Sequence, residues 1–140
     1  MTETMKLFIP CLPIAQPRPR ATTINGSARM YEAKKSHPIH EFKAAIRLAW
    51  HQAGAIKLQG EIAANIECVF YRPAKVPKKL GTARLPHTAR PDCDNLGKGI
   101  LDALNGLAYD DDKQVSVLTV RKVKAAEGET PGVTVYLTAE

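Results

Sequence analysis

An alternation of apolar residues between positions 62 and 71 constrains the fold more than any other part of the sequence. Residues Ile62, Ala64, Ile66, Cys68 and Phe70 fall on one side of an extended chain, and the intervening residues fall on the other. Successive side chains of a strand point to opposite faces of the sheet, so this period of two predicts a β-strand with one buried face. The chain therefore needs a sheet that other elements cover.

Apolar spacing and turn signals define those other elements. Phe42, Ile46 and Trp50 recur at helical spacing, which predicts a helix with one buried face. In chain order, the sequence predicts a strand at 6–10, a loop at 14–37 with a small hairpin turn at Asn25-Gly26, a helix at 36–54 and a strand at 62–71. A basic loop at 72–90 follows, then a helix capped by Asp94 and ended by Asn105-Gly106, and then antiparallel strands at 115–123 and 133–138. This order predicts one α+β domain over residues 1–140, with two main helices packed on a mixed β-sheet of about four strands.

The charge balance favours a polyanionic partner. The 140 residues carry 20 Lys and Arg side chains against 14 Asp and Glu side chains, a formal net charge of +6. A basic surface attracts nucleic acids, although a modest net charge alone is weak evidence.

The cysteines and the N-terminal segment indicate a cytoplasmic protein. Three cysteines occur without a Cys-x-x-Cys pair or a matched histidine spacing, which predicts reduced thiols and no structural zinc site. The first apolar patch is interrupted by Pro10 and Pro13, so we expect neither a signal peptide nor a membrane span.

Two polar segments concentrate the positive charge, one within residues 14–37 and one within residues 72–90. Each is either a solvated connector or a surface that lies along phosphates, where it adds affinity without reading sequence. The second segment contains prolines and no acid, and we expect a mobile loop. The candidate DNA-binding residues are Arg18, Arg20, Arg72, Lys75, Lys78, Lys79, Arg84 and Arg90.

All aspartates of the chain lie between residues 90 and 115, directly after this basic loop. Asp92 and Asp94 precede a predicted helix, Lys98 lies one turn past Asp94, and the acids at 110–112 enter a strand that can return one of them. Magnesium prefers hard oxygen ligands and commonly takes one or two carboxylates plus phosphate oxygens. The pattern therefore predicts metal-assisted chemistry on a phosphate polymer, with Lys98 stabilising the charge that develops on the phosphate.

Each of these residues also has a structural interpretation. Asp94 suits a helix cap, Asp94 with Lys98 suits a surface ion pair, and three consecutive aspartates are common in solvated turns. We expect Asp102, one turn beyond Lys98, to be structural. The sequence has no phosphate-cradling glycine loop of the Walker type, so we expect no nucleotide cofactor.

Three strings of residues carry a resemblance to a known family. They are Arg90-Pro-Asp-x-Asp-Asn-Leu-x-Lys, then Leu-Asp-Ala-Leu-Asn-Gly, then Asp111-Asp112-x-Gln114-Val115. Together they closely resemble the signature of the RusA family of Holliday-junction resolvases, which is found in bacteria and their prophages. The similarity extends to the Pro-Arg-Pro-Arg segment, the Tyr31 loop and the helix that carries Trp50, so it covers most of the chain.

The resemblance implies a RusA-like, homodimeric, Mg²⁺-dependent endodeoxyribonuclease that cuts two opposing strands of a four-way junction in DNA recombination and repair. Mn²⁺ is expected to substitute for Mg²⁺. The family's metal-binding and catalytic acids match Asp92, Asp94 and Asp112, its essential lysine matches Lys98, and Asp111 matches a neighbouring acid that we include among the metal ligands.

A two-fold dimer suits the approximate two-fold symmetry of a four-way junction. Exposed apolar positions on the strand at 115–123 or on the helix at 96–104 are the candidate dimer surface. Two alternative functions stay open: a non-catalytic nucleic-acid-binding module whose acids are structural, and a nuclease that acts on flaps or forks.

Overall fold

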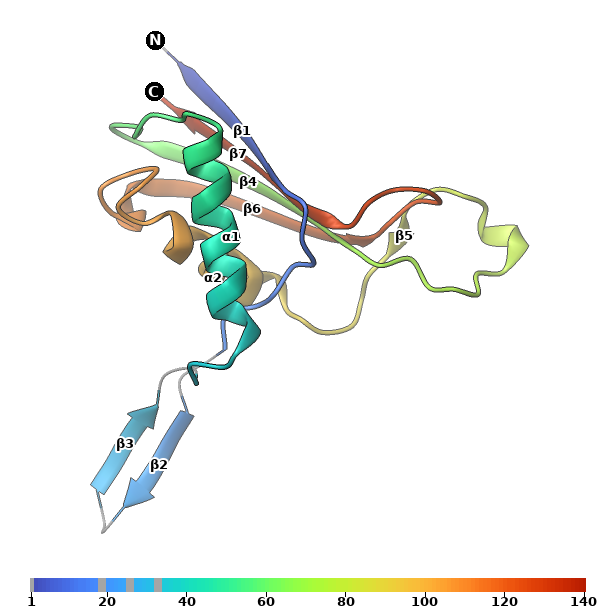
Figure 1. The fold of residues 1–140 in the computed structure, drawn as a ribbon, viewed down its shortest axis with the longest axis horizontal. Helices are drawn as coiled ribbons and strands as arrows, with labels where there is room; N and C mark the ends of the chain where they lie inside the picture. Colours follow the sequence, from blue (N-terminus) through green and yellow to red (C-terminus); the bar gives the residue numbers. More distant parts are fainter. Residues whose placement is uncertain (1, 18–19, 25–26, 32–33) are drawn as a thin grey trace.

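Five strands form the main sheet, in the order β1-β7-β4-β6-β5 (Figure 1). The computed structural model describes residues 2–17, 20–24, 27–31 and 34–140. The strands are β1 (Glu3–Ile9), β4 (Ile62–Phe70), β5 (Leu85–Pro86), β6 (Val115–Lys124) and β7 (Gly132–Ala139). β7 pairs antiparallel with β1 and β4, whereas β6 pairs parallel with β4. The predicted mixed sheet is confirmed, with β5 as a two-residue addition to four long strands.

β4 lies in the middle of the sheet and has one buried face, as its alternation predicts. Ile62 and Ile66 are completely buried, whereas Ala63 and Asn65 between them are exposed. From Ile62 to Cys68 the buried residues recur at every second position, so this face of β4 carries the core. The alternation ends there, since Val69 is buried and Phe70 is half-buried.

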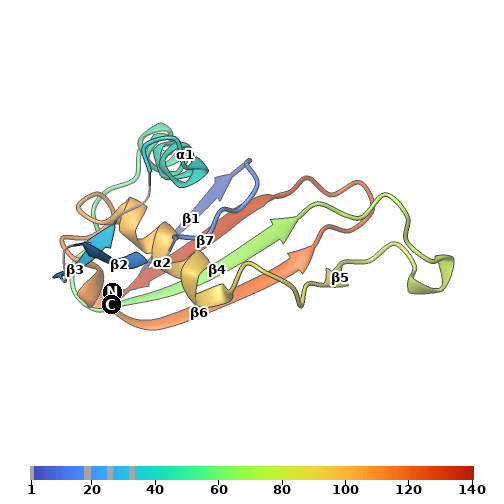
Figure 2. The same cartoon turned by 90° about the horizontal axis from the view of Figure 1, so that it is seen from below.

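Both predicted helices are present and lie on the same face of the sheet (Figure 2). They are α1 (Pro38–Gln52) and α2 (Cys93–Leu104). Phe42, Ile46 and Trp50 of α1 are buried, and so is the apolar stripe of α2. The α+β class with two helices packed on the sheet is therefore confirmed. None of the helices in the described part of the chain is long and apolar enough to cross a membrane.

Two glycines let α2 approach its neighbours closely. A Cβ atom at Gly97 would lie 2.9 Å from a methyl carbon of Val120 on β6, and one at Gly99 would lie 3.3 Å from Ile39 of α1. A larger side chain at Gly97 would force α2 away from the sheet, since protein interiors are close-packed. The glycines therefore fix the position of α2 on β6 and α1.

The start of α2 differs from the prediction. The helix begins at Cys93 with Asp92 as its N-cap, two positions before the predicted cap at Asp94. The chain enters the helix directly after Pro91, so Asp94 becomes an acid of the first turn. In this position its charge is stabilised by the positive end of the helix dipole.

The last two strands run in opposite directions, as predicted, but they are not neighbours. β4 lies between β6 and β7. Val133, Val135 and Leu137 of β7 are almost completely buried, whereas Val117 and Leu118 of β6 are exposed. Burial against the helices therefore places β7 in the interior of the sheet and leaves β6 close to its edge.

A separate two-stranded sheet follows the first strand. β2 (Arg20–Ile24) and β3 (Ser27–Tyr31) pair antiparallel, with Ile24 opposite Ser27. This pairing confirms the predicted small hairpin, whereas its turn at Asn25-Gly26 and the candidate Arg18 lie outside the described residues.

Candidate functional site

Asp92 and Asp94 lie at the N-terminus of α2, and both are exposed. Asp92 has an extended backbone, with φ −77° and ψ 146°, and its side chain makes no capping hydrogen bond with the helix. Asp92 also lines a cavity of about 360 Å³ together with Arg90, Pro91 and Asn95. Asp92 thus lines a surface cavity, and its side chain does not cap the helix.

Lys98 follows Asp94 on α2 and also interacts electrostatically with Asp112. It is exposed and lies one helical turn after Asp94, on the same side of α2. Burial, a hydrogen bond with Asp111 and the charges of Asp111 and Asp102 raise the pKa of Asp112, while the charge of Lys98 acts in the opposite direction. Lys98 and Asp112 therefore interact electrostatically, although they come from separate segments.

The three consecutive acids have different surroundings. The Asp110 carboxylate pairs with Lys57 Nζ at 3.0 Å. Asp111 caps a short 3₁₀ turn, and the hydrogen bond from the Lys113 backbone N–H holds the pKa of Asp111 below its usual range. The pKa of Asp112 is lowered by the charge of Lys98, against the burial and the neighbouring acids that raise it. The three acids therefore differ in their contacts: Asp110 pairs with Lys57, Asp111 caps the 3₁₀ turn, and Asp112 interacts with Asp111 and Lys98.

Gln114 and Tyr109 hold the acidic run in place. Gln114 Nε2 donates to the Gly60 carbonyl at 3.0 Å, and its Oε1 accepts from two backbone amides of the run. Tyr109 is completely buried, and its hydroxyl donates to the Leu101 carbonyl of α2 at 2.6 Å. Burial and the neighbouring acids raise the pKa of Tyr109, so the hydroxyl keeps the proton that it donates. The run is thereby tied to α2 and to the segment before β4.

Asp102 makes a structural contact, but with Lys43 of α1 and not with Lys98, the ion-pair partner that its position one turn beyond Lys98 suggests. Its carboxylate lies 3.9 Å from Lys43 Nζ of α1. It is also close enough to Asp112 to raise the pKa of that carboxyl. Asp102 therefore contributes to the helix interface and adds negative charge beside Asp112.

The chemistry of the donor set fits magnesium. Over residues 2–17, 20–24, 27–31 and 34–140, no group of three or more His, Cys, Asp or Glu side chains is arranged to hold a metal ion. A magnesium site does not require three carboxylates, because waters and substrate phosphate oxygens commonly complete it. A cation beside Asp112 would oppose the burial and the neighbouring negative charges that raise the pKa of that carboxyl. The carboxylates named here are thus of the type that a magnesium ion binds together with phosphate oxygens.

Lys122 of β6 holds the segment that leads into Asp92. Its Nζ donates to the Pro91 carbonyl at 2.8 Å and also to the Ala89 carbonyl. The cis peptide bond between Arg90 and Pro91 lies between these two acceptors. Sequence reasoning missed Lys122, since within a strand it looks like any polar residue, and its partners lie 31 and 33 positions earlier.

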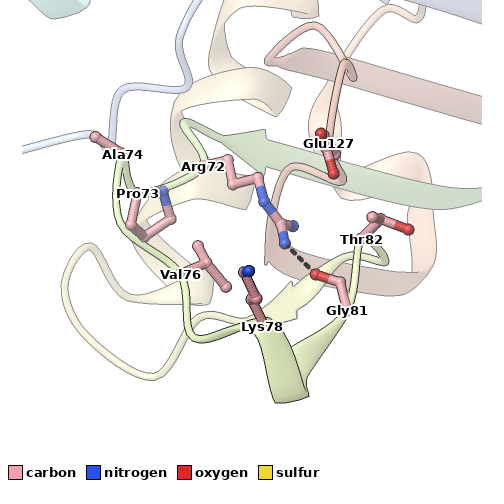
Figure 3. Close-up of a pocket in the computed structure, with 8 residues that line it drawn as sticks. All are labelled: Arg72, Pro73, Ala74, Val76, Lys78, Gly81, Thr82 and Glu127. Carbon is pink, nitrogen blue, oxygen red and sulfur yellow. Dashed lines mark hydrogen bonds between the residues drawn. The ribbon is translucent and has the colours of Figure 1, made fainter.

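Two of the candidate DNA-binding arginines make contacts inside the protein. Arg72 donates to the backbone carbonyls of Gly81, Ala83 and Ala125 at 2.8, 2.8 and 3.1 Å. Figure 3 shows Arg72 directed towards Gly81 beside a cavity of about 410 Å³. Arg84 pairs with Glu67 at 2.9 Å and with Glu129 at 2.6 Å. Both arginines thus brace the loop in which they lie.

The remaining candidates of the basic loop are exposed, namely Lys75, Lys78, Lys79 and Arg90. Arg20, in the other polar segment, is the first residue of β2. The chain before it passes α2, where the Gln16 N–H donates to the Asn95 carbonyl at 2.9 Å. The N-terminal basic segment therefore begins beside the helix that carries Asp94 and Lys98.

The chain is similar to known proteins over most of its length. The family model described as endodeoxyribonuclease RusA matches residues 10–138. The chain is also similar to the uncharacterized protein YqaN of Bacillus subtilis (strain 168), with 34% identity over 125 residues that cover 82% of this chain and 84% of that protein.

Proposed function

Since this chain belongs to the RusA endodeoxyribonuclease family, we propose that it resolves four-way DNA junctions by paired, metal-dependent cuts in opposing strands. Family membership supports the activity of an endodeoxyribonuclease. The observation that carries the site assignment is the position of Lys98. It follows Asp94 by one helical turn, and its charge lowers the pKa of Asp112. Acids from two separate segments beside one lysine fit phosphodiester hydrolysis.

In this proposal Asp92, Asp94 and Asp112 hold Mg²⁺ or Mn²⁺, with Asp111 beside them. The ion supplies a polarised phosphoryl oxygen and an activated water. Lys98 stabilises the negative charge that develops on the phosphate when the water oxygen attacks phosphorus and the P–O bond to the leaving strand breaks.

We propose that the exposed basic side chains of the basic loop bind the DNA backbone. The lysines of the basic loop and Arg90 lie on the chain segment that leads into Asp92. Their contacts to phosphates give affinity that falls with added salt and does not depend on base sequence.

Replacing Lys122 by Ala is expected to lower the single-turnover cutting rate by about 10-fold and to raise the Mg²⁺ concentration required. Without its amine, the carbonyls of Ala89 and Pro91 lose their donor, and the segment before Asp92 is no longer fixed. Cleavage of a synthetic junction at several Mg²⁺ concentrations measures both effects.

Arg121→Ala provides a matched control, because Arg121 precedes Lys122 on β6 and is exposed. Lys122→Arg should recover part of the metal response, since a guanidinium can donate to both carbonyls. An unchanged rate and metal requirement in Lys122→Ala would show that these hydrogen bonds do not position Asp92.

The open edge of β6 is the proposed dimer surface. Leu96, Ile100 and Leu104 of α2 are completely buried in the core, whereas Val117 and Leu118 of β6 are 55% and 44% exposed. In the described chain β5 pairs with the last two residues of β6 and leaves the rest of that edge without a strand partner. An open edge can pair with a second strand, and a two-fold axis would pair two copies of β6 antiparallel.

Val117→Lys is expected to convert a dimer of about twice the chain mass into a monomer, because a lysine on an edge strand opposes pairing. Size-exclusion chromatography with light scattering measures the mass. Leu48→Lys, at a residue of α1 that is 57% exposed, is the control and should remain dimeric. A Val117→Lys protein that stays dimeric would place the interface elsewhere.

A single cleavage assay separates the proposed function from its alternatives. The substrates are a synthetic four-way junction, a flap and a linear duplex, each with Mg²⁺, with Mn²⁺ or with a chelator. We expect symmetric paired cuts in the junction, with metal present. Binding without cutting under every condition would identify a non-catalytic module, and efficient cutting of flaps would identify a nuclease of broader specificity.

A further inference from the structure

The basic loop, residues 72–90, extends beyond the end of the main sheet (Figures 1 and 2). It carries a short 3₁₀ turn, η1 (Lys78–Leu80), near its far end. Leu80 is 50% exposed there, next to the exposed side chains of Lys78 and Lys79. The sequence contains no acid between Glu67 and Asp92. An exposed leucine is common by itself, but this one lies within a segment that attracts polyanions.

The turn that carries Leu80 is held by hydrogen bonds. The Leu80 N–H donates to the Pro77 carbonyl at 3.0 Å, and Arg72 Nη2 donates to the carbonyl of Gly81, the next residue, at 2.8 Å. Figure 3 shows this bond between Arg72 and Gly81 across the loop. The exposed leucine thus sits on backbone that is already ordered, which lowers the entropy lost on binding.

The base of the loop is tied to the sheet. Arg84 pairs with Glu67 of β4 and with Glu129 of the connection between β6 and β7. The Glu127 N–H donates to the Thr82 carbonyl at 2.9 Å, and β5 pairs with the end of β6. These contacts therefore fix the position of the loop relative to the sheet.

We propose that Leu80 is an apolar wedge that enters four-way junction DNA at the branch point, where base stacking is interrupted, while Lys78 and Lys79 contact the adjacent phosphates. This inference rests on the proposed function. Apolar side chains that enter a base step must separate the stacked bases, and this costs least where stacking is already broken. The lysines attract any DNA, whereas the leucine gains contact at a branch, so the loop favours junctions over continuous duplex.

Leu80 fits this role better than the other aliphatic side chain of the turn region. Val76 lines the cavity beside Arg72 and is half-buried, so its side chain contributes to the loop itself. Leu80 does not line that cavity, and half of its surface is exposed to solvent.

Fluorescence of 2-aminopurine tests the wedge. The base analogue is placed at the branch of an immobile junction, or in the middle of one arm as a reference, and binding is measured with a chelator present so that nothing is cut. We expect wild-type protein to increase the emission at the branch and not in the arm. At saturating protein, Leu80→Ala should lose most of this increase, and its junction affinity should fall about 3- to 10-fold with little change on linear duplex.

Three variants complete the experiment. Leu48→Ala removes a leucine of similar exposure from α1 and should behave as wild type. Leu80→Phe keeps an apolar wedge and should retain the signal. Lys78→Ala with Lys79→Ala should weaken binding to junction and duplex alike, reduce the slope of log affinity against log salt by about 2, and keep the branch signal at saturation.

The outcomes separate the wedge from the proposed function. If wild-type protein cuts junctions but Leu80→Ala keeps the full branch signal, or if wild-type binding leaves the branch emission unchanged, the wedge is refuted and the proposed function stands. If wild-type protein binds no junction at all, both are refuted.

Discussion

Asp92→Asn is expected to lower the rate of junction cutting by about 10³-fold or more while binding of the junction is retained or strengthened. The amide has nearly the shape of the carboxylate but lacks its charge, so it cannot provide the anionic ligand that a magnesium site needs. The fold should tolerate the change, since Asp92 is exposed and its side chain makes no capping hydrogen bond. Removing one negative charge beside the DNA backbone also favours binding.

Asp110→Asn is the matched control for this experiment. It removes a carboxylate from the same acidic stretch, but one that pairs with Lys57 and not with the residues beside α2. We expect near wild-type cutting, because an exposed ion pair contributes at most about 1 kcal/mol to stability. Single-turnover cleavage and gel-shift binding measure both variants, and comparable cutting by Asp92→Asn and wild type would remove Asp92 from the site.

Lys98→Ala is expected to reduce the cutting rate by about 10²- to 10³-fold, the scale on which the loss of one preorganised donor to a transition state acts. Lys98 is exposed on α2, and its charge lowers the pKa of Asp112, whereas burial and the neighbouring acids raise it. Its removal should change the free energy of unfolding by less than about 0.5 kcal/mol, as for most surface substitutions.

Urea denaturation and cleavage kinetics together test this prediction. Lys57→Ala removes an exposed lysine that pairs with Asp110, and it should leave cutting intact. An unchanged cutting rate in Lys98→Ala would indicate that Lys98 is only a surface ion-pair partner. A large loss of stability would instead indicate a structural role.

Local patterns were sufficient to predict the elements but not their order in the sheet. The alternation from Ile62 predicts β4, and the spacing of Phe42, Ile46 and Trp50 predicts α1, because each pattern reflects one buried face. The neighbours of β7 could not be derived in this way. Its place between β1 and β4 depends on how deeply Val133 and its alternating partners pack beneath the helices, which is a property of the whole fold.

The same limit applies to the candidate site. The motif identifies the acids and Lys98, because their spacing along the chain is local. It does not show that Asp110 pairs with Lys57, or that Lys122 holds the Pro91 carbonyl, since these partners lie 53 and 31 positions away. Charge composition likewise suggests that every arginine of the basic loop is available to DNA, whereas Arg84 is paired with Glu67 and Glu129.

Anomalous diffraction from crystals of the protein with junction DNA and Mn²⁺ tests the metal assignment most directly. We expect a manganese peak bounded by the carboxylates of Asp92, Asp94 and Asp112, next to a backbone phosphate and within reach of Lys98. A peak held by other residues, or bound DNA with no peak among these three acids, would contradict it.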